Sequence, residues 1–409
     1  MNRNGLHKVQ AAIIAALIIA VSLVGYFAML NYVLQGSPST MEGGATTSFG
    51  ESELYVSKEE SAGSKKEESI RYVVDIVGRN VTLPEKINRV AAIGPGMLRL
   101  VCYLNAVDML VGIEESEIKW GFRGRDYAMA YGERFKDLPI IGPGGPGKPP
   151  APELIITVKP DLIIMSRTYC DFYDPDRLQS ETKAAVIVID YGPAGQLDIN
   201  GFIYAMRVLG KALNREERAE QIIRFTVEVS DDLNRRTKDI DQRPKVYVGA
   251  ISYKGAQPFT TTQTPFPPLV LLNTPSIADK YSSGAGVFFW DYEAIIAEQP
   301  EIIFIDEGNL ATVKQDFEKD PGKYMQLSTF RKGRVYGTLP YNYYHTNIAV
   351  ALADAYWMGK VLYPDRFSDV DPITKADEIF TVFVGKPLYQ MYADAYGGFI
   401  CLADMFRVP

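Results

Sequence analysis

The densest group of chemically active side chains is a segment rich in tyrosine and histidine near the C-terminal end. Directly after Pro340 the chain reads YNYYH, which places Tyr341, Tyr343, Tyr344 and His345 within five residues. A phenol or an imidazole can bind ferric haem iron, and neutral histidine is a common metal ligand. Aromatic faces also suit a flat macrocycle or a catecholate chelate. We therefore predict that this segment contacts a ligand, with His345 as a candidate metal ligand. The alternative is a tyrosine-rich loop that packs on its own part of the fold.

Further candidate ligand-binding residues follow the strands that the sequence predicts. In open α/β sheets the loops at the carboxyl ends of the strands line the binding crevice. Arginine and lysine in such loops can pair with the carboxylates of an anionic chelate, although each alone is more often a solvated surface charge. The candidates are Met97, Trp120, Arg123, Arg167 and Tyr169 in the first half of the chain and Tyr253, Lys254 and Trp290 in the second.

Composition excludes several classes of protein. The chain carries 50 acidic against 43 basic residues, a net charge of −7, which argues against a nucleic-acid-binding protein. It has two histidines, His7 and His345, and its three cysteines, Cys102, Cys170 and Cys401, lie far apart without a CxxC pair. A multi-histidine metal site, a zinc ribbon and an iron–sulfur cluster are therefore excluded.

The sequence also offers little for catalysis or nucleotide binding. It contains neither GxSxG nor HExxH. The segment from Gly142 to Pro149 approaches a phosphate-binding loop, but Pro149 stands where Ser or Thr is required. Pro143 and Pro146 also remove amide donors that such a loop needs. We therefore expect no nucleotide site, no resident cofactor and no enzymatic activity.

The sequence from residue 70 onward predicts an α/β fold with two lobes. Short β-branched runs alternate with longer helical patterns, which indicates βα units and a mostly parallel sheet in each lobe. The N-terminal lobe, 70–213, has a predicted hairpin at 71–83, strands at 90–93, 110–113, 162–165 and 185–189, and helices at 97–104 and 152–158. The C-terminal lobe, 242–364, has predicted strands at 245–250, 302–305 and 334–337, and helices at 268–272, 292–298 and 347–362.

A single long helix is predicted between the two lobes, within residues 214–241. Residues 215–240 contain neither Gly nor Pro, and the apolar positions recur at spacings of three and four. Asn214 is the expected N-cap, with two glutamates in the first turn, and Pro244 closes the segment. The alternative is a surface helix within one large sheet.

The two ends of the chain predict three further segments. Residues 9–34 are mostly apolar, and no charged residue lies between Lys8 and Glu42, so residues 1–35 are predicted to be a membrane anchor or a signal segment. Arg3 and Lys8 precede this stretch, which places the N-terminus in the cytoplasm and the rest outside. Residues 36–69, rich in Ser, Gly, Glu and Lys, are predicted to be a flexible linker.

The C-terminal extension, residues 365–409, is predicted to be helical. A helix is expected to start at Asp371 or Pro372, with Ile373, Ala376, Ile379 and Phe380 on one face. We expect the extension to pad the second lobe or to shape the rim of the cleft.

The order lobe, helix, lobe resembles the class III solute-binding proteins of ABC importers, which bind iron–siderophores, cobalamin, haem and related metal chelates. Four segments carry the resemblance: 88–113, 138–166, 288–306 and 331–340. Residues 138–166 contain LPIIGPGGPGKPPAPELIITVKPDLIIMS, the most specific part of the match. The anchor, the linker and the extension from Asp365 onward lie outside it. The resemblance implies a ligand cleft between the lobes and only a small rocking motion about the long helix.

The resemblance also implies a permease-docking residue on each lobe. These would be Glu153 in APELI and Glu293 in DYEAI, each in the first turn of a helix. A carboxylate at this position is favoured by the helix dipole whatever its function, so the docking role depends on the pairing of the two across the lobes. The implied partners are an ABC permease and its ATPase.

The sequence therefore predicts a monomeric, membrane-anchored, extracytoplasmic binding protein. Its ligand is expected to be an iron–siderophore or a haem-type complex, with cobalamin as a less favoured choice. Capture of bare zinc or manganese is disfavoured, because related cation-binding proteins rely on several histidines. Two alternatives remain: a secreted or anchored α/β hydrolase, and the ectodomain of a ligand sensor.

Overall fold

The computed structural model of the chain describes residues 71–282 and 284–407. The predicted anchor (1–35) and linker (36–69) lie outside these residues. Among the described residues, no helix is long and apolar enough to cross a membrane.

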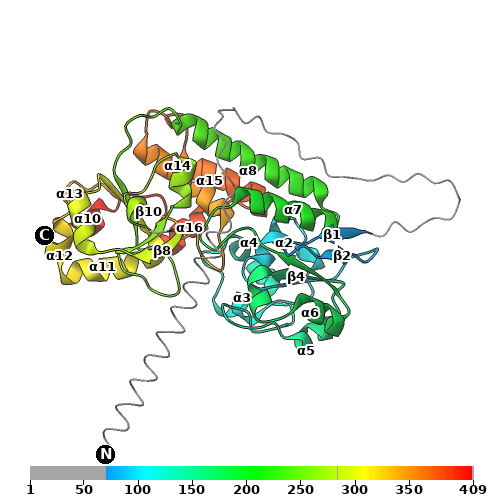
Figure 1. Cartoon of the computed structure of the whole chain (residues 1–409). Coiled ribbons are helices and arrows are strands. Elements are labelled where there is room, and N and C mark those ends of the chain that lie inside the picture. The colour runs from blue at the N-terminus through cyan, green and yellow to red at the C-terminus, as the bar shows by residue number, and fades with distance from the viewer. Residues whose placement is uncertain (1–70, 283, 408–409) are drawn as a thin grey trace, which may run out of the picture. The chain divides into compact units, whose positions relative to one another are not determined.

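The first lobe, residues 71–213, is built on a parallel sheet with the strand order β3-β4-β5 (Figure 1). Every residue of β3 (Val90–Ile93), β4 (Leu162–Ser166) and β5 (Ala185–Ile189) is buried, as expected for strands covered by helices on both faces. The other elements are β1 (Tyr72–Val74), β2 (Asn80–Thr82), α2 (Met97–Tyr103), α3 (Glu115–Lys119), α4 (Asp126–Phe135), α5 (Pro152–Ile155), α6 (Pro175–Thr182) and α7 (Ile199–Leu213). The predicted hairpin is confirmed, since β1 and β2 pair antiparallel.

The second lobe, residues 242–364, repeats this plan with the parallel strand order β10-β9-β6. Its strands are β6 (Val246–Gly249), β9 (Ile302–Asp306) and β10 (Val335–Thr338). A separate antiparallel hairpin, which the sequence did not predict, pairs β7 (Thr261–Thr264) with β8 (Gly286–Phe289). The helices are α9 (Pro267–Leu271), α10 (Tyr292–Glu298), α11 (Leu310–Lys319), α12 (Pro321–Met325), α13 (Ser328–Arg331) and α14 (Ile348–Leu362).

The long helix predicted between the lobes is α8, Glu216–Thr237. It buries a stripe of side chains at helical spacing: Ala219, Ile222, Ile223, Thr226, Val229 and Leu233. Near its start Arg218 donates to the carbonyl of Tyr103 in the first lobe (2.9 Å), and near its end Asp232 accepts from the hydroxyl of Tyr356 in the second (2.8 Å). In Figure 1 this green helix lies along both lobes. The helix therefore packs on each lobe as well as connecting them.

The structure differs from the sequence prediction at residues 110–113 and at the boundary between α7 and α8. Residues 110–113 form isolated bridges at Leu110 and Ile113 rather than a strand. Asn214 is the C-cap of α7, with a left-handed φ of 53°, and Arg215 takes the N-cap position of α8. The reason is that α7, which the sequence analysis did not predict, ends immediately before α8, and asparagine tolerates the left-handed turn between two helices.

The C-terminal extension, here called the tail, forms α15 (Pro372–Val384) and α16 (Tyr389–Tyr396). The predicted start is confirmed: the Asp371 side chain accepts from the backbone N–H of Thr374. Ala376, Ile379 and Phe380 are buried as predicted, but Ile373 is 45% exposed, because it lies in the first turn beyond the packed surface. The tail then returns to the second lobe, where the N–H of Leu402 donates to the carbonyl of Val335 at the edge of β10 (2.8 Å).

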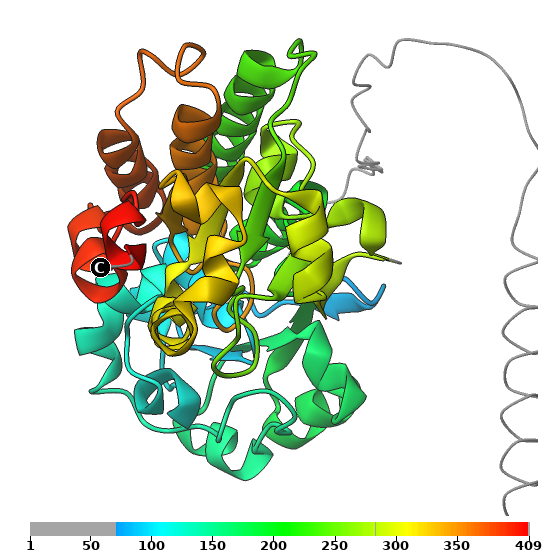
Figure 2. The same cartoon turned by 90° about the vertical axis from the view of Figure 1, so that its left-hand side faces the viewer.

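The tail also fastens itself to the first lobe. The buried ring of Phe383 contacts Tyr103 (4.8 Å between ring centroids), Phe202 (6.3 Å) and Phe225 on α8 (6.3 Å). Beside it, the hydroxyl of Tyr131 on α4 donates to the carbonyl of Val384 (2.9 Å). Figure 2 shows the orange-to-red end of the chain standing beside the green helix α8. The tail therefore bridges both lobes, a wider role than the padding predicted for it.

We predict that Phe383→Ala lowers the free energy of unfolding by about 3–5 kcal/mol, since it empties a buried aromatic cluster. The measurement is urea denaturation of the full chain. Ile373→Ala on the same helix is the matched control, and we expect it to change stability by less than about 0.5 kcal/mol because its side chain is exposed. Equal effects of the two substitutions would contradict the bridging role of Phe383.

Candidate functional site

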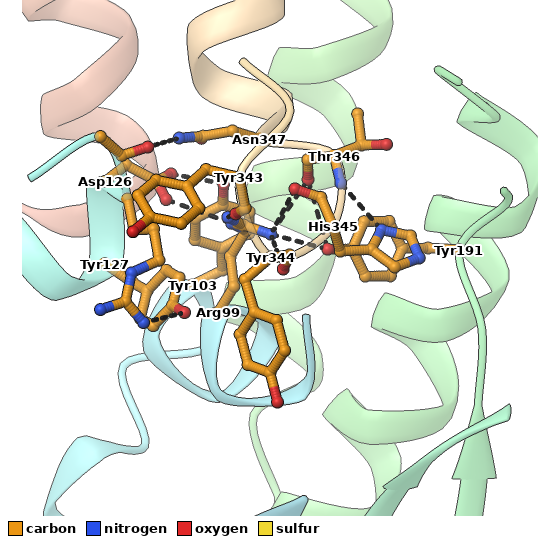
Figure 3. Close-up of polar contacts among 12 residues, drawn as sticks. Arg99, Tyr103, Asp126, Tyr127, Tyr191, Tyr343, Tyr344, His345, Thr346 and Asn347 are labelled. Atoms are coloured by element: carbon orange, nitrogen blue, oxygen red, sulfur yellow. Dashed lines mark hydrogen bonds and ion pairs between the residues drawn. The ribbon is translucent and has the colours of Figure 1, made fainter. Parts of the chain in front are cut away.

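The predicted ligand-binding segment is the loop between β10 and α14. We call residues 341–347 the aromatic loop. Its backbone is unusual, because Tyr344 and His345 have φ values of 52° and 84°, which residues other than glycine rarely adopt. The loop belongs to the second lobe in sequence, yet most of its polar groups bond to the first lobe (Figure 3). For example, the hydroxyl of Thr346 donates to the carbonyl of Gln196 (2.8 Å) and accepts from the N–H of Gly195 (2.9 Å).

Arg99 on α2 is the main contact from the first lobe. Its side chain is fully buried. Nη1 donates to the carbonyl of Thr346 (3.1 Å), with the carbonyls of His345 (3.4 Å) and Tyr344 (3.5 Å) also in range, and Nη2 donates to the carbonyl of Tyr343 (3.1 Å). One guanidinium of the first lobe thus reaches four successive carbonyls of the second.

Asp126, at the start of α4, balances the charge of Arg99. Its Oδ1 lies 3.2 Å from Nε of Arg99, and both side chains are fully buried. The hydroxyl of Tyr103 donates to Oδ2 (2.5 Å). With its amide nitrogen turned toward Asp126, Asn347 donates to both carboxylate oxygens at 3.2 and 3.0 Å. The carboxylate is therefore satisfied by groups from both lobes.

His345 is buried rather than presented to a ligand. Its ring packs on Tyr191 of the first lobe (4.0 Å between centroids), and its Nδ1 accepts from the N–H of Thr346 (2.9 Å). Burial, with Arg99 nearby, lowers the pKa of His345 to about 3, so the imidazole is neutral. Nε2 lies 3.9 Å from Asp190. Within the described residues, no three His, Cys, Asp or Glu side chains gather as a group that could hold a metal ion.

Tyr344 reaches a second buried carboxylate, Glu114. The hydroxyl of Tyr344 donates to Oε2 of Glu114 (3.1 Å) and accepts from the N–H of Gly145 (3.0 Å). The hydroxyl of Tyr169 donates to Oε1 (2.7 Å), and the N–H of Gly94 donates to Oε2 (2.8 Å). Burial raises the pKa of Glu114 to about 7 in spite of these donors.

Four side chains remain accessible where the loop meets the first lobe, and we call them the rim cluster: Trp120, Arg123, Tyr343 and Tyr396. The rings of Trp120 and Tyr343 are stacked, with centroids 6.5 Å apart and planes 22° apart. Tyr396 comes from the tail. Its hydroxyl and the ring of Tyr343 both lie close to Gly124, where the Cβ of any other residue would contact both. Both lobes and the tail thus contribute to one aromatic surface with an exposed arginine.

A cavity of about 610 Å³ adjoins the rim cluster through Arg123. It lies between α4 and the tail, and its lining mixes apolar side chains such as Phe122 and Met129 with basic and acidic ones, among them Arg134, Lys386, Glu133 and Asp394. The sequence does not predict this cavity, because the cavity forms only where the tail folds back on the first lobe.

The structure sorts the other predicted ligand-binding residues into two groups. Met97, Tyr169, Trp290 and Tyr341 are buried within the fold, and their contact with a ligand stays a prediction. Arg167, Tyr253 and Lys254 are exposed on separate loops. Arg167 pairs with Asp171 (3.8 Å) and Lys254 lies over the ring of Tyr253 (5.1 Å), and no contact joins either to the rim cluster.

Several residues at this site escaped the sequence analysis: Arg99, Glu114, Asp126, Tyr191 and Tyr396. A signal existed for Arg99, because it is the one charged residue in the otherwise apolar helix MLRLVCY. A buried charge in such a helix requires a partner. The partners themselves carry no local pattern, since they come from three separate segments: the start of α4, Tyr191 and the aromatic loop.

Glu153 and Glu293, the predicted docking residues, are exposed in the first turns of α5 and α10. Among the described residues, neither carboxylate takes part in an ion pair or a hydrogen bond. The side chain of Asp291 caps α10 by accepting from the N–H of Glu293 (2.7 Å), which leaves the Glu293 carboxylate free.

The buried position of Glu114 predicts a dependence of stability on pH. Its usual pKa is 4.5 and its folded-state pKa is about 7, so the folded chain retains a proton that the unfolded chain releases between these values. The stability contributed by this proton is fully present below about pH 4.5 and is lost as the pH rises through about 7. The free energy of unfolding of the unsubstituted chain is therefore expected to fall between pH 5 and pH 8. In Glu114→Gln we expect this fall to be smaller by about 2–3 kcal/mol.

The measurement is urea denaturation of the full chain at the two pH values. Glu115→Gln is the control, because Glu115 is the exposed neighbour of Glu114. If Glu114→Gln and Glu115→Gln kept the same pH dependence as the unsubstituted chain, Glu114 would not hold the proton.

Comparisons with known proteins agree with this architecture. The profile of the periplasmic binding protein family matches residues 125–341, slightly more than half of the chain. A search of curated proteins finds no match. Among solved structures, the chain is similar to a periplasmic solute-binding protein from Veillonella parvula (19% identity, TM-score 0.63, covering 80% of this chain and 96% of that chain).

Two further structures share the fold. The molybdate-binding protein MolA from Haemophilus influenzae is 17% identical, with a TM-score of 0.59 and coverage of 78% of this chain and 98% of MolA. CeuE from Helicobacter pylori, solved with Ni(II) bound, is 16% identical, with a TM-score of 0.54 and coverage of 77% and 96%. At these identities the structures establish the fold alone. The family consists of binding proteins, so the alternative of a hydrolase is wrong. The chain belongs to the periplasmic binding protein family.

Proposed function

We propose that this chain binds a metal chelate of the iron–siderophore or haem type outside the cytoplasm and delivers it to the permease of an ABC importer. Membership of the periplasmic binding protein family supports the binding of a solute. The identity of the solute is the proposal, and it depends on the side chains that remain accessible between the lobes.

The observation that carries the proposal is the rim cluster. The stacked pair Trp120 and Tyr343 offers aromatic faces to a flat or catecholate ligand, and the two rings come from different lobes. Arg123 is exposed near Tyr396 of the same cluster and has no ion-pair partner among the described residues. A guanidinium next to aromatic faces suits an anionic chelate, because it supplies charge and directed donors at the edge of an apolar contact.

The absence of a metal-ligand group among the described residues favours a chelate over a bare ion. In a chelate the metal is already coordinated, so the protein needs to recognise only the organic shell. Direct ligation by His345 stays a prediction, and it requires the aromatic loop to leave the position described above, because His345 is only 6% exposed. No resident cofactor is needed for this function.

The partner and the location belong to the same proposal. Glu153 and Glu293 would present one carboxylate from each lobe to arginines of the permease, and both are exposed as this requires. The apolar segment within residues 1–35 would anchor the chain, which would act as a monomer beside its transporter and the ATPase of that transporter.

A binding panel tests the ligand. The full chain in detergent is titrated with haem, ferric catecholate, ferric hydroxamate, cobalamin, molybdate and Ni(II), with tryptophan fluorescence as the signal. We expect one chelate to bind saturably, and Tyr343→Ala to weaken it at least about tenfold, which corresponds to about 1.4 kcal/mol for a lost aromatic contact.

The control is Tyr72→Ala, which removes a tyrosine that is 54% exposed on the β1–β2 hairpin. Trp120→Phe identifies how much of the signal comes from Trp120. Equal affinity of the Tyr343→Ala and Tyr72→Ala variants would contradict the rim cluster as the site. Saturable binding of molybdate or Ni(II) alone would contradict the chelate.

A second experiment tests the docking residues. In cells that depend on this chain for uptake, Glu153→Ala combined with Glu293→Ala is expected to lower uptake of the bound chelate at least about tenfold while its affinity stays unchanged. Buried or central interface charges have effects of this size. Glu115→Ala combined with Glu301→Ala is the control, since both side chains are exposed glutamates of the two lobes. Normal uptake by the first double variant would rule out the docking role.

A further inference from the structure

The aromatic loop is attached to the opposite lobe by a residue that does not reach the surface. Arg99 is fully buried, so it cannot touch a ligand at the rim. It nevertheless holds the carbonyls of Tyr343 (3.1 Å) and Thr346 (3.1 Å) and lies within 3.5 Å of those of Tyr344 and His345. Figure 3 shows these contacts converging on one guanidinium from the segment that leads into α14.

Side chains of the first lobe hold the guanidinium of Arg99 in place. Nε pairs with Asp126 (3.2 Å), Nη1 donates to the hydroxyl of Tyr191 (2.9 Å), and the group lies 5.0 Å from the centre of the Tyr127 ring. The hydroxyl of Tyr191 in turn donates to the carbonyl of Thr346 (3.2 Å). All of these partners except Thr346 belong to the first lobe, so Arg99 presents a rigid set of donors from that lobe.

The loop needs such a partner because of its backbone. The left-handed conformations at Tyr344 and His345 turn the chain while the carbonyls of four successive residues lie in range of a single cation. Each of these conformations is unfavourable for a residue with a side chain and persists only where the surroundings enforce it. A buried carbonyl without a donor is also costly. Arg99 meets both demands, since a guanidinium carries five N–H donors in a planar fork.

The position of the rim cluster follows from this attachment. The carbonyl of Tyr343 is bonded to Arg99, and the ring of the same residue stacks on Trp120 of the first lobe. The guanidinium carbon of Arg125 lies 5.5 Å from the centre of the Tyr343 ring. A shift of the backbone at Tyr343 would therefore move the ring away from Trp120 and Arg125.

We propose that Arg99 is a positioning residue of the ligand site, which sets the place of Tyr343 against Trp120 by holding the Tyr343–Thr346 backbone from the opposite lobe. The part of this inference that concerns ligand affinity rests on the proposed function. The part that concerns the loop does not. Without Arg99 the loop would keep its bonds to Glu114, Gly195 and Gln196 but would lose the donors that hold its carbonyls, while the tail would still join the lobes through Phe383.

Arg99→Lys is the main test, because lysine keeps the charge beside Asp126 but has a single ammonium in place of the fork. The full chain is studied by hydrogen–deuterium exchange and by acrylamide quenching of Trp120, taken as the difference from Trp120→Phe. We expect exchange at the amides of residues 343–347 to accelerate at least about tenfold and Trp120 to become more accessible to acrylamide. Exchange in α7 and in the three strands of the first sheet should not change.

Arg218→Lys is the matched control. Arg218 is also an arginine that donates to carbonyls of distant segments, those of Tyr103 and Phe383, but it does not touch the aromatic loop. We expect this variant to accelerate exchange near residues 382–384 and to leave residues 343–347 unchanged. Equal acceleration at 343–347 in both variants would overturn the proposal, and so would unchanged exchange there in Arg99→Lys.

Tyr191→Phe keeps the proposal testable if Arg99→Lys does not fold. It removes only the hydroxyl that braces Arg99 and Thr346, and we expect a smaller acceleration at the same amides. For the ligand, the chelate that saturates the unsubstituted chain should bind Arg99→Lys at least about tenfold more weakly. Unchanged affinity with a loosened loop would overturn the positioning role. If no chelate binds the unsubstituted chain, the proposed ligand fails while the exchange data still decide the role of Arg99 in the loop.

Discussion

A buried ion pair between Arg99 and Asp126 is the interaction on which the contact between the aromatic loop and the first lobe depends. Removing two charges from water is costly, and their mutual attraction repays this only when the remaining donors and acceptors are also satisfied. Here the satisfaction comes from the second lobe: four carbonyls of the aromatic loop surround Arg99, and the amide of Asn347 meets Asp126. The pair therefore favours the arrangement in which the loop lies against the first lobe.

Among the described residues, three of the contacts that join the lobes differ in physical character. The helix α8 connects them through the chain and buries an apolar stripe. The tail bridges them through the aromatic cluster around Phe383. The aromatic loop joins them by hydrogen bonds, with Arg99 as the main partner in the first lobe.

This arrangement also decides which side chains are available to a ligand. Tyr344 and His345 have the most evident binding chemistry, but they bond within the fold. The Tyr344 hydroxyl donates to Glu114 and accepts from the N–H of Gly145, and Nδ1 of His345 accepts from the N–H of Thr346. What remains accessible is the rim cluster, which combines the stacked rings of Trp120 and Tyr343 with Tyr396 and the exposed Arg123. For the proposed chelate, such a surface would supply aromatic faces and a positive charge.

The sequence by itself determined the two parallel sheets with their helices, the long helix between them and the cap of α15 at Asp371. Each of these follows from local rules: hydrophobic period and capping. The tertiary structure alone decided that His345 is buried beneath Tyr191, that Tyr396 of the tail joins the rim cluster, and that Arg99 holds a loop that follows it by well over two hundred residues. Local patterns report which face of an element is apolar, but they carry no information about which distant segment will cover it. Buried polar partners are chosen by the packing of whole lobes, so they become visible only when the lobes have been assembled.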